Sequence, residues 1–395
     1  MKVLILNQDY FTDLNGYLMS GIARLILEKK YKIDYFCAFR PSQKKILMDN
    51  ILSNVHVVKV KVPFLNSYNK LFRLIGLLKF SFHCLFRNLF NSQKYDIVIC
   101  SSSHIPLLGL VALIIAKINK SKFIYKIDDV WPEAEMNMES VFSKKLLNVY
   151  RLVDKYVCYK ADYITVLSND MINTINKRFS KKRSNILMIQ NLPNVNEAKI
   201  SLEDNDLNLP IKNKDTFRII FTGNIGIKQG LESLIDAMHL LNSQSQVQLI
   251  ILGKGAELYK IKQRAADLID RSIIFLPYSN NYTYISKLID SSDLGVVSLK
   301  KGVEKTAFPS KLFSYLDSNC PILCIAESDS DLSRIVNENN IGIHVDQDNP
   351  LVLKETILNL SRNSSLKNNL RNDIQIFKDD FFSTKNILSK WDKII

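Results

Sequence analysis

The sequence predicts a two-domain α/β protein in which each domain is a doubly wound parallel sheet covered by helices. Three observations carry this prediction. Short apolar runs, rich in β-branched and aromatic residues, alternate with helical segments along most of the chain, as in repeated strand–helix units. The alternation pauses once, in the Asp-, Asn- and Pro-rich stretch 196–214, which indicates a linker. A chain of 395 residues is also long enough to bury two hydrophobic cores.

The first half of the chain supplies the elements of one domain, expected over residues 1–200. Its strands are predicted from short apolar runs, because the strands of a covered parallel sheet are buried on both faces. They are residues 2–6, 33–39, 55–62, 96–100, 123–127 and 163–167. The helices expected between them include residues 21–29, 105–118 and 144–160.

A second alternating series follows the linker and forms the other expected domain, residues 201–376. Its expected strands are residues 217–221, 247–252, 273–275, 294–298 and 321–324. Its helices include residues 230–241 and 258–269. Residues 377–395 are expected to form a helix that crosses back onto the first domain.

Charge and cysteine usage limit the partners and the compartment. The net charge is +14, of which residues 1–204 carry +13. One-sided basic character is typical of proteins that bind nucleic acid, an anionic membrane or a phosphorylated substrate, although a solvated basic face is the simpler alternative. The six cysteines form no CxxC pair and no Cys/His cluster. We therefore expect neither a zinc site nor a disulfide framework, and a reducing cytosol fits.

Residues 68–90 combine basic and apolar side chains at helical spacing. The basic residues would form one narrow stripe of a helix, surrounded by Leu, Ile and Phe. They are Lys70, Arg73, Lys79, His83 and Arg87. Such a helix suits an anionic membrane surface, whereas a core-packed helix with exposed basic residues is the alternative. We expect the membrane surface, and not nucleic acid, as a partner, and a cytoplasmic protein bound peripherally to the inner face of the cell membrane.

The loop after the expected strand 217–221 is rich in glycine and contains a lysine. Residues 221–230, FTGNIGIKQG, hold three glycines, which let a backbone turn tightly and approach a ligand. The start of the next helix would offer free N–H groups to a phosphate, and Lys228 would add a mobile positive charge. The alternative is an ordinary glycine-rich turn without a ligand.

A second lysine stands near the start of an expected helix, in the segment Pro309-Ser310-Lys311. Proline suits the first turn of a helix, so the segment predicts a helix start. A helix start and a lysine can together hold a diphosphate, whereas a capped surface helix is the alternative.

A third segment is acidic and follows the expected strand 123–127. Asp128, Asp129 and Glu133 lie close to Trp131 in the sequence. Ligands of open α/β sheets bind at the carboxyl ends of the strands, so this loop is a candidate for contacts with sugar hydroxyls, the alternative being a solvated turn. His104 follows another strand and is a candidate sugar contact, although a lone histidine is more often structural.

Together these segments resemble the family-4 retaining glycosyltransferases, and among them the bacterial surface-polysaccharide enzymes. The matching motifs are D-x-W-P-E at Asp129–Glu133, G-N-x-G-x-x-Q-G-L-E at Gly223–Glu232, G-x-G at Gly253–Gly255 and P-S-K-L-F-x-Y at Pro309–Tyr315. Their order and spacing span most of the chain. The resemblance implies the GT-B fold, in which two Rossmann-like domains face each other across a cleft.

The resemblance also implies roles for single residues. Two lysines would neutralise the diphosphate of a nucleotide-sugar donor and two acids would orient sugar hydroxyls; these candidate catalytic residues are Lys228, Lys311, Asp129 and Glu133. The candidate donor-binding residues are Gly223, Asn224, Gly226, Lys228, Gly253, Gly255, Ser310 and Lys311. The candidates for contact with the acceptor or its sugar are Asp128, His104 and Gly16.

No cofactor and no metal are expected, because fixed cations can stabilise a leaving diphosphate. Asp329-Ser-Asp331 looks like a metal-binding DxD, but it precedes a helical segment and predicts a cap. The sequence also departs from the family pattern. Thr306 and Ser314 stand where two glutamates are usual, and Glu304 is near but out of register.

The resemblance implies transfer of a sugar, for which an N-acetylamino sugar is a candidate, from a UDP-sugar to a lipid-linked acceptor. The acceptor would be a polyprenyl-diphosphate-linked sugar in O-antigen or capsule assembly. Two alternatives stay open. UDP-sugar 2-epimerases share the two-domain fold but need an acid/base set, and the missing glutamate pair would fit a non-catalytic, membrane-docked subunit.

Overall fold

The computed structural model describes residues 1–8, 14–39, 54–62, 70–90, 93–102, 106–136, 143–191, 209–241, 246–279 and 281–395. The chain divides into two compact units. Unit 1 comprises Met1–Leu192, Lys305–Phe308 and Thr384–Ile395, and unit 2 comprises Pro193–Glu304 and Pro309–Ser383. The candidate His104 and most of the predicted linker 196–214 lie outside the described residues.

Unit 1 is built on a seven-stranded sheet in which all paired strands are parallel. The strand order is β3-β2-β1-β4-β5-β6-β7, and it reverses between β1 and β4 as in doubly wound folds. The strands are β1 (Lys2–Leu6), β2 (Lys32–Phe39), β3 (His56–Lys61), β4 (Ile97–Ser101), β5 (Lys122–Lys126), β6 (Tyr163–Val166) and β7 (Ile186–Met188).

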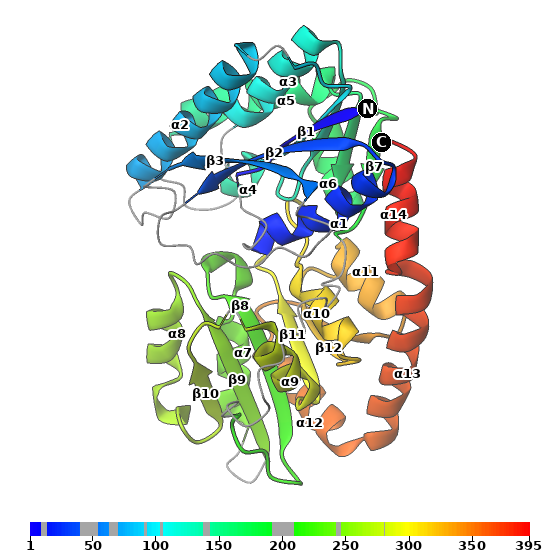
Figure 1. The fold of residues 1–395 in the computed structure, drawn as a ribbon. Coiled ribbons are helices and arrows are strands. Elements are labelled where there is room, and N and C mark those ends of the chain that lie inside the picture. The colour runs from blue at the N-terminus through cyan, green and yellow to red at the C-terminus, as the bar shows by residue number, and fades with distance from the viewer. Residues whose placement is uncertain are drawn as a thin grey trace. The chain divides into compact units, whose positions relative to one another are not determined.

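Helices cover both faces of this sheet (Figure 1). α1 (Leu14–Glu28) and α14 (Thr384–Asp392) share a hydrophobic core with the strand residues of one face, such as Ile124. The next residue, Tyr125, points to the other face and donates to Asp154 at 2.8 Å. That face is covered by α2 (Lys70–Leu89), α3 (Leu107–Asn119) and α5 (Lys144–Lys160), with α2 packed on α3 and α3 on α5.

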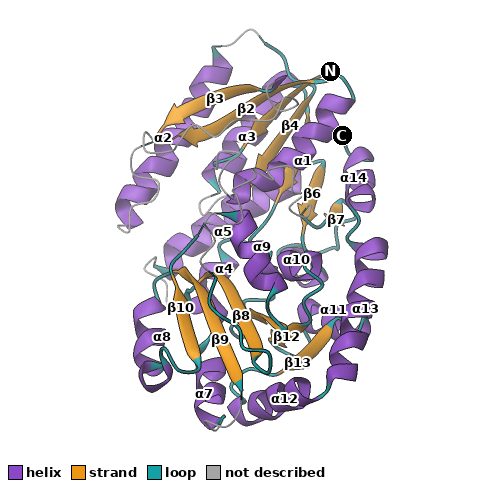
Figure 2. Ribbon diagram, turned by 60° about the horizontal axis from the view of Figure 1, so that its bottom comes forward, coloured by secondary structure: helices purple, strands orange, loops and turns teal. Residues whose placement is uncertain are grey.

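Unit 2 contains a six-stranded parallel sheet with the order β10-β9-β8-β11-β12-β13 (Figure 2). The strands are β8 (Phe217–Asn224), β9 (Val247–Lys254), β10 (Ile273–Leu276), β11 (Leu294–Ser298), β12 (Ile322–Ile325) and β13 (Gly342–Val345). The helices are α7 (Glu232–Leu240), α8 (Leu258–Arg264), α9 (Tyr282–Asp290), α10 (Lys311–Asp317), α11 (Asp331–Glu338), α12 (Pro350–Arg362) and α13 (Ser364–Phe381). The order reverses between β8 and β11, so each unit is a Rossmann-like domain.

The predicted fold class, with two doubly wound parallel sheets, is confirmed, but its C-terminal segment differs in detail. Residues 377–395 do not form one helix: α13 ends in unit 2 and α14 belongs to unit 1. At the break, Phe382 contacts Phe313 and Phe377, with ring centroids 4.9 Å and 5.1 Å apart. In unit 1, α14 packs on α1, and Lys29 forms a 2.7 Å ion pair with Asp392.

The candidate Gly16 lies within a helix. The sequence predicted polar residues before a helix over 21–29, whereas α1 begins at Leu14. The apolar spacing explains the difference, since Met19, Ile22 and Ile26 continue one buried face toward the N-terminus. In the part of the chain that the structure describes, no helix is both long and apolar enough to cross a bilayer.

Candidate functional site

The candidate site in unit 2 lies at the carboxyl ends of β8 and β11, where the strand order reverses. Ligands of open α/β sheets bind at such switch points. Two bonds join the loop after β8 to the end of β11. The backbone N–H of Lys300 donates to the carbonyl of Lys228 at 2.7 Å, and the hydroxyl of Ser298 donates to the carbonyl of Gln229 at 2.5 Å.

The glycine-rich loop has a backbone that needs glycine at its two ends. Gly223 has a φ of 113° and Gly230 a φ of 54°, both in the region that side chains disfavour. Between them, Lys228 lies half-buried in a 3₁₀ turn, Ile227–Gln229. The side chain of Gln229 accepts the N–H of Gly226 at 3.1 Å. The candidate Asn224 is exposed at the end of β8.

The G-x-G turn after β9 supports this loop by close backbone contact. A Cβ on Gly253 would lie 1.9 Å from the carbonyl oxygen of Gly223, and one on Gly255 would lie 2.1 Å from that of Ile225. The backbone N–H of Ile225 also donates to the carbonyl of Lys254 at 2.9 Å. The structure therefore accounts for both glycines of the turn by loop packing, without requiring that they touch a ligand.

A Gly253→Ala substitution should lower the free energy of unfolding by about 1–3 kcal/mol, because the new methyl group forces two packed backbones apart. Gly109→Ala in α3 is the matched control, since the nearest atoms to its Cβ would belong to the Tyr125 side chain, at 3.1–3.2 Å, and not to the backbone. Urea unfolding of both variants measures the difference. Equal stability of the Gly253 variant and the parent would contradict the packing role.

Lys311 brings a buried amine to the loop. Its Nζ is buried and, among the described residues, has no hydrogen-bond partner. Its Cε lies 3.9 Å from the position of a Cβ on Gly223, and its Nζ lies 3.6 Å from the centroid of the Phe221 ring. Burial lowers the pKa of Lys311 to about 7. A buried ammonium beside glycine backbone is a place where a ligand anion would be stabilised.

Tyr315, the last residue of the P-S-K-L-F-x-Y motif, fixes the helix that carries Lys311. Its buried hydroxyl accepts the backbone N–H of Thr222 at 3.0 Å and donates to the carbonyl of Ile220 at 3.3 Å. Its ring fills the space above Gly295, where a Cβ would approach to 2.6 Å. These contacts attach α10 to β8 and β11. The candidate Ser310 is exposed at the start of α10, and its side chain makes no cap hydrogen bond.

Glu304 is a buried acid. The sequence marked it only as a glutamate close to, but out of register with, the glutamate positions that are usual in the family. Burial, followed by a hydrogen bond with Glu327, raises the pKa of Glu304 to about 7. The backbone N–H of Gly302 donates to its Oε1 at 3.2 Å. The two acids are 23 positions apart, so no sequence signal foreshadows their contact.

A Glu304→Gln substitution should make stability less dependent on pH. The unfolded carboxyl loses its proton near 4.5 and the folded one near 7, so folding of the parent weakens as pH rises between these values. The loss is at most about 3 kcal/mol, from 1.36 kcal/mol per pKa unit. In unfolding curves, the free energy of unfolding of the variant relative to that of the parent should therefore be higher at pH 8 than at pH 5. Parallel pH profiles would contradict the raised pKa.

The acidic loop of unit 1 is attached to neighbouring segments through its backbone and its first acid. Asp128 forms an ion pair with Lys126 and accepts from the side-chain amide of Asn191 at 3.4 Å. The next residue, Asp129, is half-buried, and its backbone forms an isolated antiparallel β-bridge with Ala307. The N–H of Val130 donates to the carbonyl of Thr306 at 2.7 Å. Residues 305–308 thus belong to unit 1, which the sequence did not predict.

Glu133, predicted to be catalytic, has its carboxylate bound by two arginines. Arg178 donates to it twice, at 2.9 Å and 2.5 Å, and Arg151 donates at 3.1 Å. Arg178 is fully buried at its side chain and also pairs with Asp154 at 2.5 Å and donates to the carbonyl of Trp131 at 3.1 Å. These contacts favour a structural role for Glu133, holding the acidic loop in place. Sequence reasoning missed Arg178, which no motif marks.

The described residues hold no group of three or more His, Cys, Asp or Glu side chains that could bind a metal ion. The DxD-like segment forms a helix cap, as predicted, although the cap residue is Ser330, whose hydroxyl accepts the N–H of Ser333 at 3.1 Å. Asp331 pairs with Arg334 in the first turn of α11. Among the predicted site residues, the side chain of Lys311 lies next to Gly223, and Gly223 belongs to the same loop as Lys228.

Comparison with known proteins identifies the part of the chain that contains this site. Residues 204–376 match the family described as glycosyl transferases group 1. This part of the chain is thus similar to a glycosyltransferase domain. The Lys311 site and the glycine-rich loop both lie within the matched residues. The match agrees with the class of enzyme that the motifs predicted, a glycosyltransferase.

Longer similarities point in the same direction. WbjE of Pseudomonas aeruginosa, described as a probable glycosyltransferase, is 26% identical over 244 residues, which are 60% of this chain and 59% of WbjE. The match therefore spans less than two thirds of that relative. The structure of WaaG, described as a glycosyltransferase involved in lipopolysaccharide biosynthesis, covers 100% of this chain and 99% of its own with a TM-score of 0.68 and 13% identity. The structure of a Staphylococcus aureus TarM mutant covers 100% of this chain and 99% of its own, with a TM-score of 0.65 and 14% identity. At such identities the structures show a shared fold.

Proposed function

We propose that the protein is a retaining glycosyltransferase that moves a sugar from a UDP-sugar to a polyprenyl-diphosphate-linked acceptor in surface polysaccharide assembly. The observation that carries the proposal is the buried Nζ of Lys311, unpaired among the described residues, within a glycosyltransferase domain. A lysine held without a counter-charge costs stability. A ligand diphosphate would remove that cost, so the site suits a nucleotide-diphosphate donor.

The choice of UDP and of an N-acetylamino sugar has support from a structural relative. The TarM structure was solved in complex with UDP and an α-GlcNAc-glycerol. Surface polysaccharide assembly has support from WaaG, which is described as acting in lipopolysaccharide biosynthesis. These similarities suggest the chemical class of donor and product, and the residues around Lys311 suggest how the donor is held.

In this proposal the leaving diphosphate is stabilised by charge that is already in place before reaction. Lys311 and Lys228 would interact with its oxygens beside the backbone of Gly223. The N–H groups of Ile225 and Gly226 already donate to Lys254 and Gln229 and so shape the loop. Departure from the same face that the acceptor attacks would let a donor phosphate oxygen take the acceptor proton and would retain the configuration of the sugar. Asp129 would orient a sugar hydroxyl. No metal or further cofactor is part of the proposal.

A transfer assay tests this function. The full chain is incubated with labelled UDP-sugars and a membrane lipid extract, and the lipid fraction is analysed for label. We expect label in the lipid fraction with one donor. Conversion of the UDP-sugar without any acceptor would instead identify a 2-epimerase, and binding of no UDP-sugar would identify a non-catalytic subunit.

The acceptor would be reached at the inner face of the cell membrane through helix α2. The helix and the residue that follows it carry large apolar side chains that are 43–86% exposed, namely Phe72, Ile75, Phe82, Phe86, Leu89 and Phe90. Exposed Lys79 and Arg87 lie among them. Burial, then the neighbouring Arg87 and Lys79, lower the pKa of His83, which is therefore neutral at pH 7. An apolar face with basic neighbours suits an anionic interface.

A Phe82→Ser/Phe86→Ser double substitution should weaken binding to anionic vesicles by about 10- to 30-fold, because two partly exposed aromatic rings no longer enter the interface. The control is Leu351→Ser/Ile376→Ser, which removes two apolar residues of unit 2 that are 62% and 63% exposed. Vesicle flotation measures both variants. Unchanged flotation of the α2 variant would rule out this helix as the membrane contact.

A further inference from the structure

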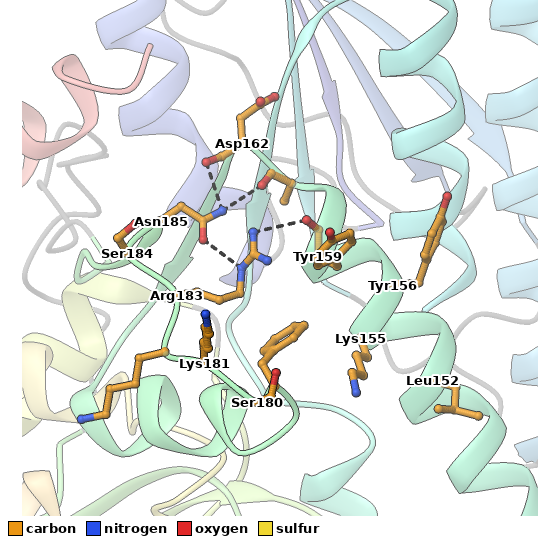
Figure 3. A pocket seen from close by; sticks show the side chains of 13 residues that line it. Leu152, Lys155, Tyr156, Tyr159, Asp162, Ser180, Lys181, Arg183, Ser184 and Asn185 are labelled. Carbon is orange, nitrogen blue, oxygen red and sulfur yellow. Dashed lines mark hydrogen bonds between the residues drawn. The ribbon is translucent and has the colours of Figure 1, made fainter.

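A pocket of about 970 Å³ lies on unit 1 between helix α5 and the segment that follows α6 (Asn169–Asn176). Its walls come from residues 152–162 and 179–185 (Figure 3). None of these residues belongs to the candidate donor site in unit 2. No sequence motif singled out this region, because its side chains come from two segments that are separated by β6 and α6.

The pocket combines several cations with very little negative charge. Four of its lining residues are basic: Lys155, Lys181, Lys182 and Arg183. In the described part of the chain, no carboxylate forms a salt bridge with any of them. The only acid among the lining residues is Asp162, whose Oδ2 accepts the N–H of Phe123 at 2.7 Å. Its side chain points away from Arg183 in Figure 3. The local field therefore favours an anionic ligand.

Arg183 is held in a fixed orientation within the pocket. Its Nε donates to Asn185 at 3.0 Å and its Nη2 donates to the carbonyl of Tyr159 at 3.2 Å. Its guanidinium carbon lies 5.3 Å from the ring centroids of both Tyr159 and Phe179. The side-chain amide of Asn185 is itself fixed by the carbonyl of Ala161 at 2.8 Å. Such a guanidinium is prepared for an anion because less side-chain entropy remains to be lost on binding.

The surface beside the pocket is apolar at helical spacing. On α5, four residues three or four positions apart are 44–65% exposed, namely Val149, Leu152, Tyr156 and Tyr159. Ile118, at the end of α3, is 58% exposed, and neighbouring Lys117 donates to the hydroxyl of Tyr156 at 3.2 Å. Since α3 packs between α2 and α5 (Figure 1), exposed apolar residues occur on three neighbouring helices.

We infer that this pocket binds the phosphate headgroup of an anionic membrane lipid, while the exposed side of α5 rests on the bilayer together with α2. Basic pockets beside apolar surface suit lipid headgroups, and tyrosines with an apolar body and a polar tip suit the interface. The exposed aliphatic Val149, Leu152 and Ile118 favour lipid over nucleic acid, which offers no acyl chains to cover them. The inference rests on the proposed membrane location of the enzyme.

The test compares two charge variants of the full chain. Lys181→Gln/Lys182→Gln removes two exposed pocket lysines, and Lys214→Gln/Lys262→Gln removes two exposed lysines of unit 2 as the control. Flotation uses phosphatidylcholine vesicles with and without phosphatidylglycerol. We expect binding to the anionic vesicles to fall about 10- to 30-fold in the pocket variant only, from roughly 1 kcal/mol per basic residue near the surface.

Equal binding by both variants, or no preference of the parent for anionic vesicles, would overturn the inference. So would competition by 10 mM inorganic phosphate or a single-stranded oligonucleotide that removes the difference between the variants, because the pocket would then serve a soluble anion. UDP-sugar binding by calorimetry and sugar transfer to detergent-solubilised lipid extract should be the same in all three proteins. If the parent neither bound UDP-sugars nor transferred sugar, that result would count against the proposed function, independently of the vesicle result.

Discussion

A Lys311→Met protein should bind UDP-sugars about 30- to 1,000-fold more weakly than the parent while being more stable without ligand. The affinity falls because a buried cation facing a diphosphate contributes about 2–4 kcal/mol to binding. Methionine has a similar length and fills the same space without a charge. Calorimetric titration with UDP-N-acetylglucosamine and other UDP-sugars measures the affinity, and urea unfolding measures the stability.

The gain in stability follows from the lowered pKa of Lys311. The amine of the unfolded chain keeps its proton up to about 10.5, whereas the folded one loses it near 7. Folding of the parent is therefore penalised at every pH below about 10.5, the pKa of the unfolded chain, and the penalty is complete below about pH 7. The shift from 10.5 to about 7 corresponds to a penalty of about 5 kcal/mol, from 1.36 kcal/mol per pKa unit. The variant should gain up to about that amount at pH 7 and progressively less toward pH 10.

The same pKa couples donor binding to proton uptake. At pH 8 the unliganded Lys311 is mostly neutral, and a bound diphosphate would restore its charge, so binding should take up nearly one proton. At pH 6 the lysine is already charged and the uptake should be small. Titrations in two buffers with different ionisation enthalpies measure the proton count directly.

Lys262→Met is the matched control for this prediction. Lys262 also lies over a phenylalanine, 5.4 Å from the Phe275 ring centroid, but it is exposed. Its replacement should change neither affinity nor proton uptake. A Lys311→Met protein that binds UDP-sugars normally, or that is less stable than the parent, would show that this lysine has a packing role and no ligand.

The regular elements of the fold were predictable where periodicity extended over enough residues. Residues 2–6 and 294–298 form strands and residues 144–160 a helix, within the predicted bounds. β7 and β13 were not predicted, since they have only three and four residues, and half-exposed positions interrupt their burial. The break between α13 and α14 depends on contact of Phe382 with Phe313, 69 positions away, which local patterns cannot encode.

The candidate site was predictable as a set of residue types but not as a geometry. Motifs pointed to Lys311 and to the glycines of both loops. They did not indicate that Gly253 supports Gly223 by backbone contact, because the two strands become neighbours only in the folded sheet. Nor did they mark Glu304 as one of a pair of acids. Long-range contacts of this kind decide whether a residue binds a ligand itself or holds in place another residue that binds it.

Glu133 illustrates this distinction, and an Arg178→Met substitution should expose it. Arg178 is buried and pairs with both Glu133 and Asp154. Removing it leaves buried Asp154 without a cation and Glu133 with Arg151 alone, so the free energy of unfolding should fall by about 3–5 kcal/mol. The triple variant Arg178→Met/Glu133→Gln/Asp154→Asn carries neither the cation nor the two charges, and it should recover most of that loss. Urea unfolding at pH 7 compares the three proteins.

A Glu133→Gln variant separates structure from chemistry. If Glu133 holds the acidic loop, the single substitution should weaken folding by about 1–3 kcal/mol, because Arg178 loses one of its two charged partners. Sugar transfer by the folded fraction should then keep most of the parent rate. A variant that folds as stably as the parent but transfers no sugar would instead assign Glu133 to the reaction, as the D-x-W-P-E motif suggested. Arg151→Gln is the control, since Arg151 is 41% exposed at its side chain and its ion pair with Glu133 should contribute under about 1 kcal/mol.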